Sequence, residues 1–140
     1  IRIILRFLLA AILGGLLGYD REIKGKAAGL RTHMLVSFGA ALFVLIPQQS
    51  GASIADLTRV LQGLIAGVGF LGAGSIIIGR HQEEAKGMTT AAGIWLTAAI
   101  GVAAGMGREA TAILSTLFAL GILSLIPKVE RLFERRGRGS

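Results

Sequence analysis

The sequence has no cysteine and only two histidines, His33 and His81, so it offers few of the side chains that enzymes use for catalysis. Without cysteine there is neither a thiol nucleophile nor a thiolate ligand for a metal ion. Neither histidine stands in a pattern that indicates a catalytic triad, and the chain contains no H-E-x-x-H or Walker motif. We therefore expect a protein that is not an enzyme, with no catalytic residue, no bound metal and no cofactor.

Charged residues are scarce as well, at 16% of the 140 residues, whereas hydrophobic residues account for 53%. A soluble domain of this size carries about 25% charged residues. The mean hydropathy of +0.70 agrees with this imbalance. The composition excludes an ordinary soluble domain and is typical of a membrane protein.

Five apolar runs approach the ~20 residues that a helix needs to cross a membrane. The predicted spans are about residues 3–19, 32–46, 59–79, 88–105 and 110–126, and Pro47 and Pro127 are expected to end the second and the fifth. We predict an all-α fold, a polytopic transmembrane helical bundle with glycine-rich packing. Residues 1–127 form the transmembrane domain, and residues 128–140 form a basic cytoplasmic tail.

Basic residues are distributed unevenly over the two sides that five spans define. Eleven Lys and Arg fall in the first and third loops and the C-terminus, against four on the other side. Because cytoplasmic loops retain the positive excess, the N-terminus is predicted outside and the C-terminus in the cytoplasm. This topology and the anionic lipid bilayer account for the net charge of +7, so nucleic acid is not an expected partner.

Residues 63–74, GLIAGVGFLGAG, contain the G-x-G-x-x-G pattern of a dinucleotide-binding loop at Gly67, Gly69 and Gly72. That fingerprint requires a preceding strand and an acidic residue about 20 positions later. Here the flanking residues read as one apolar span, and the nearest acids, Glu83 and Glu84, follow too closely. We therefore reject the nucleotide site.

Glycines four residues apart recur in three spans, at Gly14 and Gly18, at Gly63 and Gly67, and at Gly101 and Gly105. This spacing clears one helix face of side chains, so that another backbone can approach closely. We expect these pairs to serve helix packing within the chain or homodimerisation. The alternative is a broken helix at GFLGAGS, whose freed carbonyls and Ser75 hydroxyl line a polar cavity as in transporters.

The first predicted cytoplasmic loop, DREIKGKAAGLRTH, gathers charges of both signs. Asp20 and Glu22 each precede a lysine by four positions, which favours a helical continuation beyond the membrane. The simplest interpretation is a solvated elbow at the interface. The alternative is a divalent-cation site in which Asp20 or Glu22 meets Glu83 or Glu84, because hard cations prefer several oxygen ligands.

The five predicted spans contain no acidic residue. Ion carriers usually place ionisable side chains inside the bilayer, where burial implies a task. A transported ion would therefore depend on backbone carbonyls and on the uncharged polar side chains Gln62, Ser75, Thr89, Thr90 and Thr97.

Three stretches, in this order, resemble the signature blocks of the MgtC/SapB family of bacterial inner-membrane proteins: YDREIKGKAAGLRTHMLVSFGAALF, GVGFLGAGSII and KGMTTAAGIWLTAAIGVAAGMG. The resemblance extends from the first span to the end of the fourth, and the fifth span matches only in being apolar. The soluble C-terminal domain of longer members is not expected here.

The resemblance implies a protein of the bacterial cytoplasmic (inner) membrane, linked to survival in low magnesium, acid or phosphate stress. It implies a regulator of ion homeostasis or membrane energetics that acts through membrane protein partners, with the F-type ATP synthase as one of them. The family's characteristic positions in this sequence are Asp20, Arg21, Glu22, Ala28, Gly29, Leu30, Arg31 and Thr32; Gly69, Phe70, Leu71, Gly72, Ala73 and Gly74; and Thr89, Thr90, Ala91, Ala92 and Trp95. Asp20 departs from the family, which often has glutamate there.

The three blocks are expected to converge near the cytoplasmic surface. In this hypothesis Arg31 pairs with Asp20 or Glu22 around a small polar pocket whose floor is Gly72 and Gly74. Thr89 and Thr90 would cap the start of the fourth span. The leading function is that of a homodimeric modulator, and the alternative is a small ion or solute transporter or channel that acts as an oligomer.

Overall fold

The structure, a computed structural model, describes the backbone of residues 1–78 and 84–139; the side chains of residues 78 and 84–86 are not described. Every regular element in these ranges is an α-helix: α1 (Arg2–Ile23), α2 (Leu30–Gln49), α3 (Ile54–Ile78), α4 (Glu84–Gly105) and α5 (Glu109–Gly137). All five are long and apolar enough to cross a membrane, so the predicted transmembrane helical fold is confirmed.

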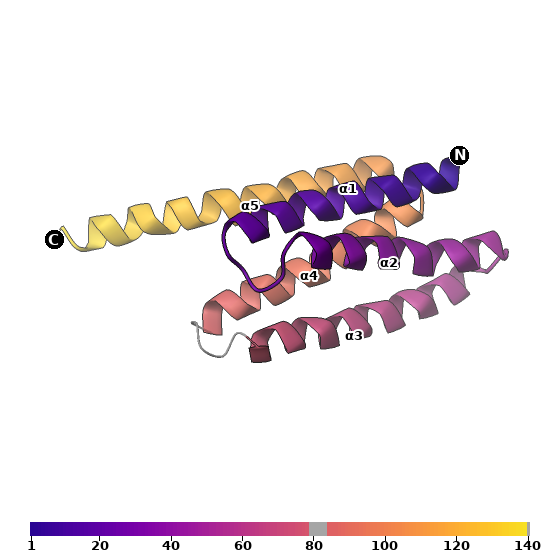
Figure 1. Cartoon of the computed structure of the whole chain (residues 1–140), viewed down its shortest axis with the longest axis horizontal. Coiled ribbons are helices and arrows are strands. Elements are labelled where there is room, and N and C mark those ends of the chain that lie inside the picture. The colour runs from indigo at the N-terminus through magenta and orange to yellow at the C-terminus, as the bar shows by residue number, and fades with distance from the viewer. Residues whose placement is uncertain (79–83, 140) are drawn as a thin grey trace.

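Helices α1, α2 and α4 pack against one another and form the core of the bundle (Figure 1). Helix α3 lies outside α2 and α4, and α5 lies outside α1 and α4. Only 11% of the most apolar stretch of α3 is buried inside the bundle, against 39% of that of α4. Helix α3 therefore directs most of its surface away from the rest of the chain.

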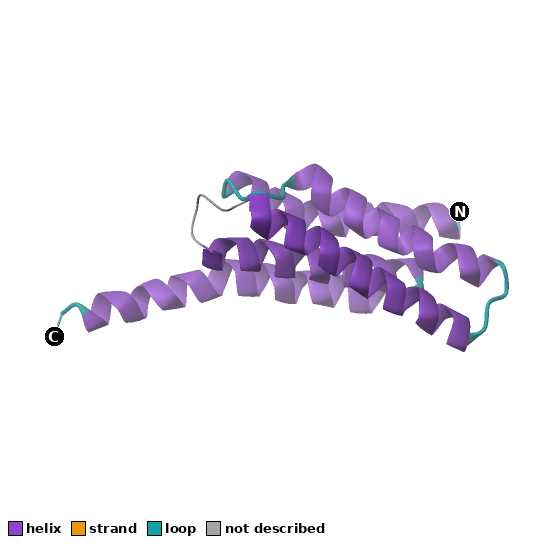
Figure 2. Ribbon diagram, turned by 90° about the horizontal axis from the view of Figure 1, so that it is seen from below, coloured by secondary structure: helices purple, strands orange, loops and turns teal. Residues whose placement is uncertain are grey.

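The α1–α2 connection lies at one end of the bundle, and the N-terminus lies at the other (Figures 1 and 2). The C-terminal part of α5 projects beyond the bundle at the former end, which we call the α1–α2 end. The first loop and the C-terminus thus share one end, as the five-span interpretation requires.

Helices α1 and α2 touch through the first glycine pair. A Cβ atom at Gly14 would lie 2.6 Å from the carbonyl oxygen of His33, and one at Gly18 would lie 2.7 Å from the Cα of Leu30. Real Cβ atoms essentially never come this close to backbone atoms. Glycine is therefore required at both positions for this approach.

Helices α2 and α4 touch in the same way, and Ser37 of α2 lies at both contacts. A Cβ atom at Gly105 would lie 2.6 Å from the carbonyl oxygen of Ala41, and one at Gly101 would overlap the carbonyl of Ser37. The expectation that glycine pairs serve packing within the chain is thus confirmed for the first and fourth spans.

The third glycine pair makes no such contact, because within residues 1–78 and 84–139 no neighbouring atom lies within 4 Å of a Cβ placed at Gly63 or Gly67. Helix α3 also continues without a break to Ile78, and the Ser75 hydroxyl donates to the Gly72 carbonyl of the same helix at 2.7 Å. The broken-helix alternative is therefore wrong.

Two helices, α3 and α4, begin four or five residues earlier than predicted. Helix α3 starts at Ile54 rather than near residue 59 because Ser53 and Asp56 form a capping box: the Asp56 amide donates to the Ser53 hydroxyl oxygen at 3.2 Å, and the Ser53 amide donates to the Asp56 carboxylate at 3.3 Å. Helix α4 starts at Glu84 rather than near residue 88. Thr89 and Thr90 consequently lie in its second turn, and the prediction that they cap it is wrong.

Neither proline ends its helix, contrary to the prediction. Helix α2 runs through Pro47 to Gln49, and α5 runs through Pro127 to Gly137. A proline inside a helix leaves the carbonyl four residues earlier without its amide donor. In α5 that carbonyl belongs to Leu123, and the Lys24 ammonium donates a hydrogen bond to it at 3.3 Å. The same ammonium forms an ion pair with the Asp20 carboxylate at 2.9 Å.

The glycine contact between α2 and α4 can be tested with matched alanine variants. Gly101→Ala should lower the free energy of unfolding by about 1–3 kcal/mol, because the added methyl group meets the Ser37 backbone and forces the helices apart. Gly121→Ala is the control, because no atom lies within 4 Å of a Cβ placed at Gly121. Thermal unfolding of both purified proteins in the same detergent is the measurement, and equal melting temperatures would contradict the packing.

The lysine contact at the α5 proline can be tested with a double-mutant cycle. Lys24→Met should cost about 0.5–1.5 kcal/mol in the wild-type chain, since the Leu123 carbonyl loses its donor. The same substitution should cost less in a Pro127→Ala chain, where the amide of residue 127 donates to that carbonyl in the regular helical pattern. If the two substitutions lower the free energy of chemical unfolding by strictly additive amounts, Lys24 does not stabilise the protein through a hydrogen bond to this carbonyl.

Candidate functional site

Three buried polar side chains from the three core helices lie toward the α1–α2 end of the bundle. They are Arg21 in the last turn of α1, His33 near the start of α2 and Thr90 in the second turn of α4, and they are 3%, 1% and 2% exposed. We call these three residues the buried polar cluster. Such burial indicates a specific role, because polar groups inside a membrane protein are costly unless they are bonded.

A hydrogen bond inside the cluster connects α1 to α4. The Arg21 guanidinium donates from Nη2 to the Thr90 hydroxyl oxygen at 3.2 Å, across 69 positions of sequence. The Nε of Arg21 is also buried and has no hydrogen-bond partner among the described residues. The guanidinium is therefore held in place by one bond and retains N–H donors that the described residues do not satisfy.

The histidine is oriented by its own helix. His33 Nδ1 lies 2.9 Å from the carbonyl oxygen of Gly29, and a carbonyl can only accept, so Nδ1 is the donor. In the neutral ring this assigns Nε2 as an acceptor. Nε2 lies 3.9 Å from the position of a Cβ at Gly93 of α4, so it faces that helix.

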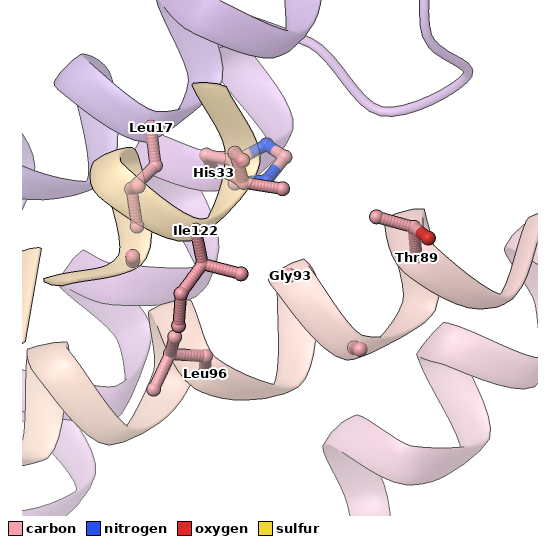
Figure 3. A pocket seen from close by; sticks show the side chains of 9 residues that line it. Leu17, His33, Thr89, Gly93, Leu96 and Ile122 are labelled. Carbon is pink, nitrogen blue, oxygen red and sulfur yellow. The ribbon is translucent and has the colours of Figure 1, made fainter. Parts of the chain in front are cut away.

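A small cavity adjoins the cluster, with His33 and Thr89 on its border (Figure 3). Its volume is about 140 Å³, and it is lined by Leu17, His33, Thr89, Ala92, Gly93, Leu96, Ala119, Ile122 and Leu123. Leu17 precedes Arg21 by one helical turn, and Thr89 precedes Thr90. Of the buried polar cluster, His33 is the member that lines this mostly apolar cavity.

The two acidic residues that flank Arg21 in sequence are engaged elsewhere. The Asp20 carboxylate pairs with Lys24 at 2.9 Å. The Glu22 carboxylate lies beside Gly29, where an added Cβ would be 2.9 Å from Glu22 Oε1. In the part of the chain that the structure describes, neither carboxylate forms an ion pair with Arg21.

The prediction that Arg31 pairs with Asp20 or Glu22 is wrong. Arg31 is exposed and forms no ion pair with Asp20 or Glu22 within residues 1–78 and 84–139. Its neighbour Thr32 is half-buried. The arginine that enters the protein is Arg21, because it lies on the buried stripe of α1 and Arg31 does not lie on that of α2.

The second family block, residues 69–74, does not form the floor of a polar pocket as predicted. Gly72 packs on Ala91 of α4, where an added Cβ would be 3.4 Å from the Ala91 side chain. No atom of the described residues lies within 4 Å of a Cβ placed at Gly69 or Gly74. Phe70 and Trp95 are 85% and 53% exposed and face outward. The buried polar cluster therefore joins only the first and third blocks, and the second block reaches the third through the contact of Gly72 with Ala91.

The expected metal site falls largely outside the described residues. Glu83 and the side chain of Glu84, which were to meet Asp20 or Glu22, are not described. Within the described ranges no three His, Asp or Glu side chains gather in a way that could hold a metal ion.

His33 is absent from the sequence-based site, although the sequence carries a signal for it. It is the one ionisable side chain in the predicted second span, and an ionisable residue inside a membrane segment is a candidate for function. It also shares a helical face with Ser37, Ala41 and Val44, all of which are buried. This spacing places His33 inside the bundle.

Comparison with known proteins identifies the family. The model of the MgtC family matches residues 7–132. SrpB of Synechococcus elongatus is 42% identical over 138 residues, which cover 91% of this chain and 76% of that protein. The putative magnesium transporter YhiD of Escherichia coli is 39% identical over 129 residues, which cover 87% of this chain and 59% of YhiD.

MgtC of Brucella abortus is 40% identical over 133 residues, which cover 91% of this chain and 54% of that protein. The chain thus spans little more than half the length of two of these relatives. No solved structure matches it significantly. Together with five helices apolar enough to cross a membrane, these matches show that the chain is a bacterial membrane protein and belongs to the MgtC family.

Proposed function

We propose that the chain takes part in ion homeostasis of the bacterial inner membrane, with magnesium as the leading ion, and that it acts by binding another membrane protein. The link to magnesium rests on family membership and on the name of YhiD, a putative magnesium transporter. The proposal assigns no chemical step to the chain.

The observation that carries the proposal is an apolar hollow beside the outward-facing glycines of α3. Its volume is about 410 Å³, and it is lined by Phe43, Val60, Gly63, Leu64, Gly67 and Val68. Gly63 and Gly67 form the same pattern that joins helices inside the bundle, yet no atom of the described chain approaches them. In lipid, helices associate through close packing of this kind, so the hollow suits a transmembrane helix of a partner.

A second copy of the chain is the first partner to consider, because it carries the same glycine face, and two such faces can pack on each other about a twofold axis. The F-type ATP synthase, which the family resemblance suggests, is the second.

The bonding of the polar groups favours a partner-binding role over conduction. The hydroxyl groups of Ser75 and Thr97, which a transport path would have used, donate to carbonyls of their own helices at 2.7 Å each. The cavity beside His33 is small and mostly apolar. A single copy therefore offers hydrated ions few polar partners.

Transport as an oligomer is the second candidate function, and the name of YhiD favours it. Such a path would have to be built between copies, along surfaces that a single chain exposes. Exposed Gln62 of α3 is one polar side chain that a second copy could bring into such a path.

We also propose that the α1–α2 end faces the cytoplasm and the N-terminus faces outward. Arg21, Lys24, Lys26 and Arg31 lie at that end, and the basic C-terminal part of α5 projects there (Figure 2). The positive-inside rule assigns such an end to the cytoplasm.

The glycine face of α3 provides the test. Gly67→Leu should weaken self-association of the purified chain about tenfold or more, equivalent to about 1.4 kcal/mol, because a bulky side chain keeps the partner helix away. It should also reduce growth rescue of a strain lacking this gene at limiting magnesium. Fluorescence energy transfer between labelled chains in detergent measures the association.

Gly121→Leu is the matched control, since it adds the same side chain at another glycine with no neighbour within 4 Å. Its association and growth rescue should equal those of the wild type. The proposal fails if Gly67→Leu behaves like this control in both measurements.

A further inference from the structure

We propose that the buried guanidinium of Arg21, held by Thr90 at the α1–α2 end, is a binding site for one phosphate group, supplied by a lipid headgroup or by free inorganic phosphate. The site does not depend on the partner-binding proposal, because α3 contributes none of its residues.

The burial of Arg21 is the first argument. Its side chain is 3% exposed, and its Nε is enclosed without an acceptor in the described part of the chain. Enclosing a positive charge in a membrane protein is unfavourable unless a negative group compensates it. Asp20 is close enough to attract the guanidinium, but its carboxylate pairs with Lys24, and the carboxylate of Glu22 lies beside Gly29, so neither forms an ion pair with Arg21.

A purely structural role for Arg21 explains less of its geometry than phosphate binding does. Arginine in the last turn of a helix is favourable beside the free carbonyls of the helix end. That interaction is available to an exposed side chain as well. It explains neither why Arg21 is enclosed nor why its Nη2 is fixed by α4.

The chemistry of the group follows from the guanidinium and its depth. Arginine presents N–H groups in a planar fork that matches two oxygens of a phosphate, and the bond to Thr90 fixes the orientation of that fork. Arg21 lies two residues before the end of α1, which is about 3 Å along the helix axis. At the end of a membrane-spanning helix, lipid phosphates are the most abundant anionic oxygens.

The test uses the purified chain in a maltoside detergent and phosphate-free buffer. In one arm inorganic phosphate is titrated, and in the other phosphatidylglycerol is added in mixed micelles; sodium chloride at equal ionic strength controls for screening. The thermal unfolding midpoint reports binding, because a ligand that binds the folded state raises it. We expect one arm to raise the midpoint saturably, and that arm identifies the source of the phosphate.

Three variants locate the site. Arg21→Lys keeps the charge but removes the planar fork, and Thr90→Val keeps the shape but removes the hydroxyl group, so both should raise the apparent Kd about tenfold. Arg31→Gln removes an exposed arginine from the same end and should bind like the wild type. Because Thr90→Val conserves side-chain volume, it remains informative if the Arg21 variant does not fold.

The proposal is overturned if neither arm raises the midpoint beyond the sodium chloride control. It is equally overturned if Thr90→Val binds with wild-type affinity, or if Arg31→Gln loses as much affinity as Arg21→Lys. The last result would indicate general attraction of anions to a basic surface.

Discussion

The close approach of α2 to both α1 and α4 is the constraint on which the rest of this structure depends. In lipid the hydrophobic effect does not drive helices together, so the interface must be built from tight van der Waals contact. The four glycines at positions 14, 18, 101 and 105 permit that contact by leaving no side chain between the backbones. Helix α2 is thereby fixed in rotation as well as in position.

This rotation decides which polar groups enter the protein. Once α2 lies against Gly14 and Gly18, His33 and Ser37 must face the interior. Arg21 lies one turn beyond Leu17 on the buried stripe of α1. Its side chain therefore faces the same interior, where it donates to Thr90. The buried polar cluster is thus a consequence of helix packing, and it places the Arg21 cation at the α1–α2 end of the bundle.

Glycine pairs four residues apart have two different positions in this structure. In α1 and α4 it joins helices of the same chain, whereas in α3 it lies on an outward face beside an apolar hollow. A chain with a closed core and one open small-residue face is suited to association within the membrane. This division underlies the proposal that the protein acts through a partner.

The number of helices and their approximate positions could be predicted because apolar length alone determines them. Helix ends were less predictable, since they depend on Ser53 and Asp56 at the start of α3 and on Lys24 at the proline of α5. The choice of Arg21 over Arg31 was missed, although Arg21 continues the spacing of Gly14, Leu17 and Gly18. The use of each glycine pair could not be predicted, because G-x-x-x-G looks the same whether the partner helix belongs to the same chain or to another.

The most direct test of the account is the flux of magnesium and protons across liposomes that contain the purified chain. A closed core predicts that flux stays at the level of protein-free liposomes while circular dichroism shows the helices intact. Saturable magnesium flux that Gly121→Leu preserves and Gly72→Leu abolishes would contradict it. Because Gly72 packs on α4, that result would place a conduction path between α3 and α4 and identify the chain as a transporter.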